Sequence, residues 1–210
     1  KNGYSYLFIA DAVGHGVPAA LLTSVAFAVS RTLEFEIGRA VDSVMPSDML
    51  SALNRVLISI GSPLTQMTFF IVRIQDATGE CVYANAGNPP GYWVKKSTIG
   101  LDGRSNSRPS QLTASGNLLG EVGSSDYTDY KTTLEDGDKL VLFTDGFFEN
   151  RTADELSQLG KPWLRATIQR HAGRPIEDFA DALWRSYKRA TGATPPDDDA
   201  TILAIEFNRA

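Results

Sequence analysis

Three groups of aspartates stand beside apolar runs, where a folded chain would present them at the ends of strands. Asp11 follows the apolar run 7–10, Asp145 comes just after the run 139–143, and the aspartates 197–199 precede the last apolar run. Carboxylates that converge without a cation repel one another, so a convergent set at neutral pH indicates divalent metal ions. Because all the ligands would be oxygen atoms, the pattern favours Mg²⁺ or Mn²⁺.

Each aspartate taken alone also has an ordinary structural explanation. Asp11 is equally suited to capping the helix that follows it, and a strand followed by Asp and Gly is common turn chemistry. Zinc is disfavoured, because Cys81, His15 and His171 lack the spacing of zinc ligands. Cys81 lies in an apolar pattern and is expected to be a small buried hydrophobe rather than a nucleophile.

Composition sets the class of protein. The chain has 210 residues, 42% hydrophobic and 21% charged, which suits one globular domain or at most two small ones. Its net charge is -5 and no stripe of Lys and Arg is present, so nucleic acid is not expected as a partner. A single cysteine excludes an internal disulfide, and no apolar run reaches the ~18 residues of a membrane span. We therefore expect a cytoplasmic protein that does not enter the membrane.

Helical and extended patterns alternate around these aspartates. The spacing of apolar residues predicts helices at 19–36, 47–60, 162–171 and 176–191, and strands at 7–10, 67–74, 80–84, 92–95, 127–134, 139–143 and 200–207. The first helix is apolar enough to be buried on more than one side, and the second is expected to be capped by Ser47 or Asp48. The polar connection 95–117 is expected to be poorly ordered or a lid.

Four motifs occur in a fixed order along the chain: Asp11-Ala-Val-Gly-His-Gly-Val-Pro-Ala-Ala-Leu, Asn85-Ala-Gly-Asn-Pro-Pro, Asp136-Gly-Asp-Lys-Leu-Val-Leu-Phe-Thr-Asp-Gly146 and Asp198-Asp-Ala-Thr201. This set resembles the SpoIIE-like branch of the PPM-type (protein phosphatase 2C-like) metal-dependent serine/threonine phosphatases. The resemblance extends from about residue 4 to about residue 207. It implies an α+β fold in which two mostly antiparallel β-sheets form a sandwich flanked by helices.

The resemblance also implies a mechanism. Two Mn²⁺ or Mg²⁺ ions would bind the phosphate of a phosphoserine or phosphothreonine and activate a water molecule that attacks phosphorus, without a phosphoenzyme. By motif alignment Asp11 would bridge the metals and the carbonyl of Ala12 would help to hold one of them. Asp145 and Asp198 would hold the other, with Asp199 next to the ligand. These aspartates would thus act in catalysis through metal-bound water.

Three further residues of the same motifs, His15, Asn88 and Gly146, are expected beside the substrate. Gly146 would permit a close approach that a larger residue would block. His15 is expected near the metal ligands or facing solvent rather than in direct catalysis, and Asn88 replaces the histidine usual in the family, so it cannot shuttle a proton. The family has a further aspartate upstream of the first motif, which this sequence lacks. Either the sequence begins within the domain, after its first strands, or the site is incomplete, which leaves the second metal open.

The resemblance implies the effector domain of a bacterial signalling protein that dephosphorylates a partner. The commonest partner is an anti-sigma-factor antagonist of the STAS fold, and a sensory or receiver module commonly precedes such a domain; a homodimer is left open. Residues 95–117 and 154–160 are expected to contact the partner. The alternative is a pseudophosphatase, an adaptor that binds without turnover. Asn88 and the absent upstream aspartate favour the adaptor, whereas the retained aspartates oppose it.

Overall fold

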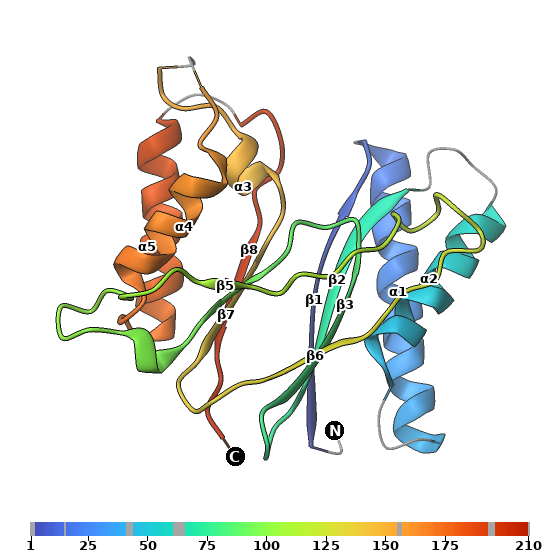
Figure 1. Ribbon diagram of the computed structural model, residues 1–210. Helices are drawn as coiled ribbons and strands as arrows, with labels where there is room; N and C mark the ends of the chain where they lie inside the picture. Colours follow the sequence, from blue (N-terminus) through green and yellow to red (C-terminus); the bar gives the residue numbers. More distant parts are fainter. Residues whose placement is uncertain are drawn as a thin grey trace. The chain divides into compact units, whose positions relative to one another are not determined.

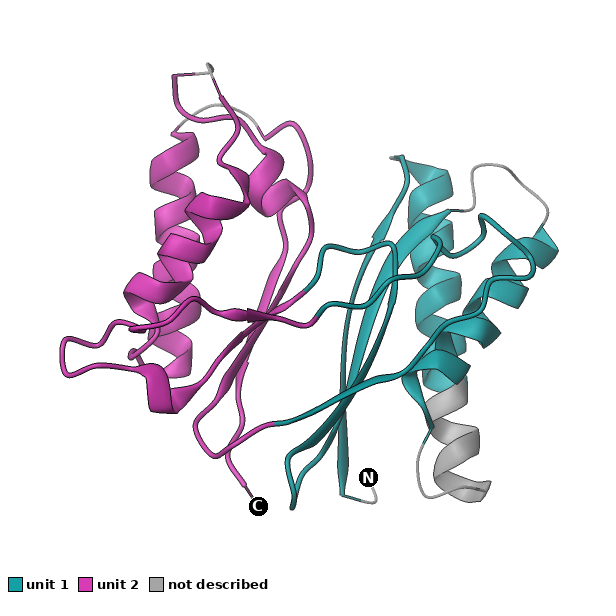
Figure 2. Cartoon of the chain, in the orientation of Figure 1, with its two compact units in different colours: residues 1–90, 113–133, 210 teal, residues 91–112, 134–209 magenta. Residues whose placement is uncertain are grey.

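The chain divides into two compact units, each built on one four-stranded antiparallel sheet. A computed structural model describes residues 3–14, 16–40, 44–60, 66–154, 157–192 and 196–209. Unit 1 comprises 1–90 and 113–133, with the last residue of the chain, and unit 2 comprises 91–112 and 134–209 (Figure 2). The expected α+β class, with two antiparallel sheets and accompanying helices, is confirmed.

The sheet of unit 1 has the strand order β1-β2-β3-β6. These strands are β1 (Tyr4–Ala12), β2 (Met67–Gln75), β3 (Glu80–Ala86) and β6 (Tyr130–Thr133). Phe69 and Ile71 are two apart on β2, so their side chains share a sheet face, where they pack with leucines of α2 (Pro46–Ile60). Helices α1 (Val17–Ala40) and α2 lie beside this sheet (Figure 1). Cys81 is fully buried in β3, and burial raises the pKa of its thiol to about 12. The interpretation of Cys81 as a buried hydrophobe is thereby confirmed.

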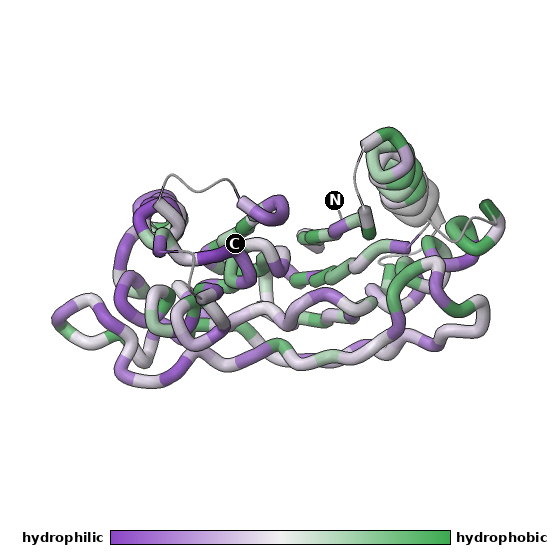
Figure 3. The backbone as a smooth tube through the Cα atoms, turned by 90° about the horizontal axis from the view of Figure 1, so that it is seen from above, coloured by the Kyte–Doolittle hydropathy of each residue, from purple (hydrophilic) through white to green (hydrophobic). Residues whose placement is uncertain are grey.

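Helix α1 (Val17–Ala40) is apolar along most of its length (Figure 3) but is buried along one stripe only. Leu22, Ala26 and Ser30 are buried at helical spacing. By contrast, Leu21 is 61% exposed and Phe27 is 59% exposed. The expectation that this helix is buried on more than one side is therefore wrong for its described side chains, because one face alone packs on the core of unit 1.

The N-terminus of α2 is capped from a distant part of the chain. The carboxylate of Asp129 accepts hydrogen bonds from the backbone N–H of Ser47, at 2.9 Å, and from its hydroxyl, at 2.6 Å. Pro46 occupies the first helical position, where its missing N–H costs nothing. The predicted start of the helix is right within a residue, but the cap comes from Asp129 rather than from Ser47 or Asp48.

The sheet of unit 2 has the order β5-β4-β7-β8. These strands are β5 (Ser110–Gln111), β4 (Tyr92–Val94), β7 (Lys139–Phe143) and β8 (Ile202–Glu206), and the helices of the unit are α3 (Gly146–Glu149), α4 (Gly160–His171) and α5 (Ile176–Thr191). Every residue of β7 is buried, as expected for a central strand. Phe179, Leu183 and Tyr187 form the buried face of α5, in agreement with the predicted amphipathic pattern. In the described part of the chain, no helix is long and apolar enough to cross a bilayer.

The first part of the long polar connection is tied to α4. The 3-10 turn η1 (Lys96–Thr98) opens it, and the backbone N–H of Ser105 donates to the carbonyl of Gln169 at 2.9 Å. Gly103 accepts a hydrogen bond from the N–H of Gly173, and a Cβ on Gly173 would come within 2.7 Å of Gly103. The expectation of a poorly ordered connection is therefore wrong for this part, because backbone hydrogen bonds anchor it at the C-terminal end of α4.

Asp138 organises the turn before β7. Its buried carboxylate accepts hydrogen bonds from Trp93 Nε1 at 2.9 Å, from the N–H of Glu135 at 3.0 Å and from the N–H of Lys96 at 2.8 Å. In Asp138→Asn the new NH₂ group would replace one of the two oxygens that accept these bonds, so at least one buried N–H donor would lose its acceptor. We therefore expect the free energy of unfolding to fall by about 1–3 kcal/mol. Urea denaturation followed by tryptophan fluorescence measures this, with the exposed Asp136→Asn as a control. Equal stability of the two variants would contradict the prediction.

His171 ends α4, and its surroundings are expected to make the free energy of unfolding depend on pH. Burial is the larger cause that lowers the pKa of His171 below 6.5, and nearby guanidinium groups add to it: Arg174, Arg170, Arg185 and Arg104. Between the lowered pKa and 6.5 the unfolded chain binds more protons, so the free energy of unfolding should fall as the pH drops below about 6.5. Urea denaturation across this range, compared with His171→Gln, measures the effect. A wild-type chain that gains stability relative to the variant on acidification would contradict it.

Candidate metal centre

Asp145 stands where β7 gives way to α3. It is the N-cap residue of α3, and its carboxylate accepts a hydrogen bond from the N–H of Gly146 at 2.9 Å. The buried strand fixes the backbone on one side, and the helix fixes it on the other. Asp145 itself is only half-buried, so one side of its carboxylate remains available to a ligand.

Asp198 lies in the segment that leads into β8, beside the end of β7. Thr144 holds this segment: its hydroxyl donates to the carbonyl of Asp199 at 3.1 Å and accepts from the N–H of Thr201 at 3.0 Å. The carboxylate of Asp198 accepts a hydrogen bond from the N–H of Asp199 at 2.8 Å. Both aspartates are exposed, and Asp198 is oriented by its own backbone.

Unit 2 therefore brings two of the predicted ligands together. Asp145 and Asp198 each offer a carboxylate oxygen, and these two atoms lie within 4.8 Å of one another. Two carboxylates at this separation repel each other in water unless a cation lies between them. A donor set made of carboxylate oxygens fits Mg²⁺ or Mn²⁺, which are hard cations. The residues present thus suit the metal that the motifs imply.

Gly146 stands against the segment that carries Asp198. A Cβ at this position would overlap the carbonyl oxygen of Asp199 and would come within 3.2 Å of the carbonyl oxygen of Asp198. Its backbone is helical, so the requirement for glycine comes from space and not from a strained φ. A larger residue at this position would therefore displace the 198–199 backbone, and the expected place of Gly146 beside the substrate stays a prediction.

Asp11 belongs to unit 1, where it is the penultimate residue of β1. It pairs with Thr68 across the sheet, and Ala12 pairs with Met67. Because Asp11 lies inside the strand and α1 begins only at Val17, Asp11 is not the N-cap residue of that helix. Gly14 and Gly16 follow with φ of 95° and 79°, as the tight turn requires. His15 falls outside the described residues.

Asn88 is buried in unit 1 within a network of amides. Its N–H donates to Oδ1 of Asn85 at 2.9 Å, and its own Oδ1 accepts from the hydroxyl of Thr68 at 3.1 Å. Asn85 also donates to the carbonyl of Asn88 at 2.8 Å and to that of Ala114 at 3.0 Å. These contacts give Asn88 a structural role in the turn after β3, where it binds Thr68, the residue that pairs with Asp11 across the sheet.

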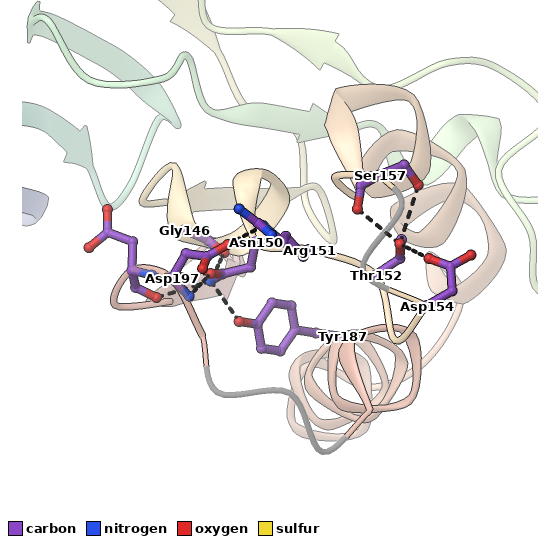
Figure 4. Close-up of polar contacts among 9 residues, drawn as sticks. Gly146, Asn150, Arg151, Thr152, Asp154, Ser157, Tyr187 and Asp197 are labelled. Atoms are coloured by element: carbon purple, nitrogen blue, oxygen red, sulfur yellow. Dashed lines mark hydrogen bonds and ion pairs between the residues drawn. The ribbon is translucent and has the colours of Figure 1, made fainter.

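Sequence patterns did not point to Asn150, which follows α3 and contacts the segment 196–199 in unit 2 (Figure 4). Asn is an ordinary residue after a short helix, so no spacing rule distinguishes it. Beside it, Arg151 forms an exposed ion pair with Asp197 at 3.3 Å. The only sequence signal for Asn150 was its position five residues after Asp145, just beyond the motif 136–146.

Comparison with known proteins gives the family of this chain. The sequence profile of the SpoIIE family, Stage II sporulation protein E, matches residues 1–208. Phosphoserine phosphatase RsbU of Bacillus subtilis (strain 168) is 30% identical over 201 residues, which are 93% of this chain and 53% of that protein. The chain thus spans about half the length of this curated relative.

Solved structures show the same fold. The SiaA-PP2C domain of Pseudomonas aeruginosa matches with a TM-score of 0.78 and 24% identity, over 98% of this chain and 81% of that one. RsbX, solved in complex with magnesium, matches with a TM-score of 0.62 and 18% identity, over 98% of this chain and 87% of that one. The resemblance drawn from the four motifs is confirmed, and the chain belongs to the SpoIIE family.

Proposed function

We propose that this chain is a metal-dependent phosphatase that removes phosphate from a phosphoserine or phosphothreonine of a partner protein. The observation that carries the proposal is the pair of carboxylates of Asp145 and Asp198, whose oxygens lie within 4.8 Å of each other. Two carboxylates this close repel each other, and a divalent cation bound between them would relieve that repulsion. Membership of the SpoIIE family and the phosphoserine phosphatase relative support the same activity.

The metal ligands that we propose are Asp11, the carbonyl of Ala12, Asp145 and Asp198, with Asp199 beside them. Hard divalent cations take about six or more oxygen ligands, so the pair in unit 2 needs further donors. Asp11 and Ala12 end β1, where paired backbone fixes both residues. We propose Mg²⁺ or Mn²⁺ as the ion, which agrees with the magnesium complex of RsbX. Whether a second ion completes the site depends on ligands beyond these residues.

When bound, a divalent ion would lower the pKa of a water molecule and neutralise charge on the phosphoryl oxygens. The chain's own residues supply the frame for this chemistry. Asp145 and Asp198 carry the negative charge that holds the cation, while the N–H groups of Gly146 and Asp199 bind and orient their carboxylates. Asn88 has no ionisable group, so its amide can form hydrogen bonds but cannot transfer a proton.

We propose a phosphoprotein of the anti-sigma-factor antagonist type as the substrate and the cytoplasm as the compartment. The curated relative is a phosphoserine phosphatase, which supports a phosphoprotein partner. The segment 154–160 and the connection 95–117 are the surfaces that we propose for partner contact. Deleting residues 100–104 should weaken turnover of the protein substrate while leaving turnover of a small phosphate ester unchanged.

Phosphate release tests the proposal directly. We expect this chain to hydrolyse a phosphoserine peptide and p-nitrophenyl phosphate with Mn²⁺ or Mg²⁺ and to stop when EDTA is added. A phosphotyrosine peptide of the same sequence serves as the control for substrate class. Hydrolysis that persists in EDTA would contradict the proposal. Absence of hydrolysis with either metal, together with tight binding of a phosphoprotein, would instead indicate the adaptor.

A further inference from the structure

Asn150 connects three parts of unit 2 through a single buried side chain. It follows α3 directly, is 2% exposed, and faces both α5 and the segment that carries Asp198 (Figure 4). The two N–H groups of its Nδ2 are shared among three acceptors: the carbonyl of Gly146 at 2.6 Å, the hydroxyl of Tyr187 at 2.9 Å and the carbonyl of Asp198 at 3.0 Å. Its Oδ1 accepts from the N–H of Asp197 at 2.5 Å and from that of Asp198 at 3.1 Å.

The polarity of these partners fixes the orientation of the amide. Two backbone N–H groups can only donate, so they require the oxygen of Asn150 on their side. Two backbone carbonyls can only accept, so they require the nitrogen on the other side. A rotated amide would place donors against donors and acceptors against acceptors, at a cost of several hydrogen bonds in a buried place. The side chain therefore has one orientation, and it holds the Asp197–Asp198 backbone in one position.

The same side chain joins the two proposed metal ligands. Gly146, one of its partners, is the residue whose N–H binds the carboxylate of Asp145. Asp198 is a second partner, and it contacts Asn150 through both its N–H and its carbonyl. The segment 196–201 has no regular secondary structure, so contacts from Asn150 and Thr144 take the place of a strand or helix in positioning it.

We propose that Asn150 is a positioning residue that sets the metal affinity of this site by fixing Asp198 relative to Asp145. This inference rests on the proposed function, since it assigns Asp145 and Asp198 as ligands. A preorganised ligand loses less conformational freedom when the ion binds, so the affinity is higher than for a loose segment. Groups that orient metal ligands typically change metal affinity by about 10–100-fold when they are removed.

The test measures Mn²⁺ binding by electron paramagnetic resonance on this chain, with circular dichroism to follow folding. We expect Asn150→Ala to raise the Mn²⁺ dissociation constant by about 10–100-fold. Turnover of a phosphoserine peptide should recover at saturating Mn²⁺. Tyr187→Phe is the matched control, because it removes one partner of the same amide and keeps both bonds to the Asp197–Asp198 backbone. Its Mn²⁺ affinity should stay within about threefold of the wild type.

Three results separate the possible failures. Asn150→Ala that binds Mn²⁺ as tightly as the wild type, while Asp198→Asn does not, would overturn this inference and leave the proposed function standing. A wild-type chain that binds no Mn²⁺ would remove the proposed function and this inference together. If Asn150→Ala does not fold, hydrogen exchange of the metal-free wild type decides: slow exchange of the Asp197 and Asp198 amides supports the inference, and exchange at the rate of an unfolded chain overturns it.

Discussion

Asp145→Asn should abolish metal-dependent phosphate release, with a loss of at least about 100-fold in kcat/KM at any attainable Mn²⁺ concentration. The substitution keeps the size of the side chain and the oxygen that accepts from the N–H of Gly146. It removes the negative charge that the cation needs. Because folding should change little, the loss would report on the ligand itself. The measurement is steady-state hydrolysis of a phosphoserine peptide across a Mn²⁺ titration.

The matched control for this prediction is Asp197→Asn. Asp197 stands in the same exposed segment as Asp198 and pairs with Arg151, but it is not among the proposed ligands. Exposed ion pairs contribute little to stability, so this variant should keep turnover within about threefold of the wild type. Equal losses in the two variants would show that the assay detects general negative charge in this segment and not a specific ligand.

Gly146→Ala should lower turnover by about 100-fold as well, for a steric reason. The added Cβ would overlap the carbonyl oxygen of Asp199, which is backbone and cannot rotate away. The segment carrying Asp198 must therefore move, and a displacement of about 1 Å at a catalytic group is enough for such a loss. Alanine is otherwise a better helix former than glycine by about 1 kcal/mol, so propensity alone would predict a gain in stability.

Gly123→Ala provides the comparison for that substitution. Gly123 is exposed, and the nearest atom to a Cβ built there is Cγ2 of Ile58, at 3.9 Å. This variant should keep wild-type turnover and stability. Normal activity in Gly146→Ala, measured beside it by peptide hydrolysis and thermal denaturation, would show that Asp198 can move without consequence and would contradict the rigid site described here.

Local sequence patterns predicted the elements that carry the site. A strand ending at Asp145, a glycine after it and an acidic segment before the last strand are short-range features, and short-range features can be read from spacing. The long connection 95–117 was harder, because its anchors, Gln169 in α4 and Gly173 just after that helix, are far along the chain. Composition alone described that segment as polar and could not show what it contacts.

The features that sequence reasoning missed all depend on contacts between distant residues. The cap of α2 comes from Asp129, 82 residues beyond Ser47, and no local rule relates the two. Asn150 contacts residues 47 and 48 positions away, so its importance appears only when the chain is folded. The exposed apolar residues of α1 show the converse limit: an apolar sequence predicts a helix well, but the number of faces that are covered depends on tertiary packing.

The most direct test of the proposed metal site is the Mn²⁺ dissociation constant of the wild type, Asp11→Asn, Asp145→Asn and the double variant, measured under one set of conditions. If Asp11 and Asp145 hold the same ion, each single substitution should weaken Mn²⁺ binding strongly. The dissociation constant of the double variant should then be little higher than that of the single variant that binds Mn²⁺ less tightly. Asp11→Asn that binds Mn²⁺ like the wild type, or two losses that simply add, would contradict a shared metal site.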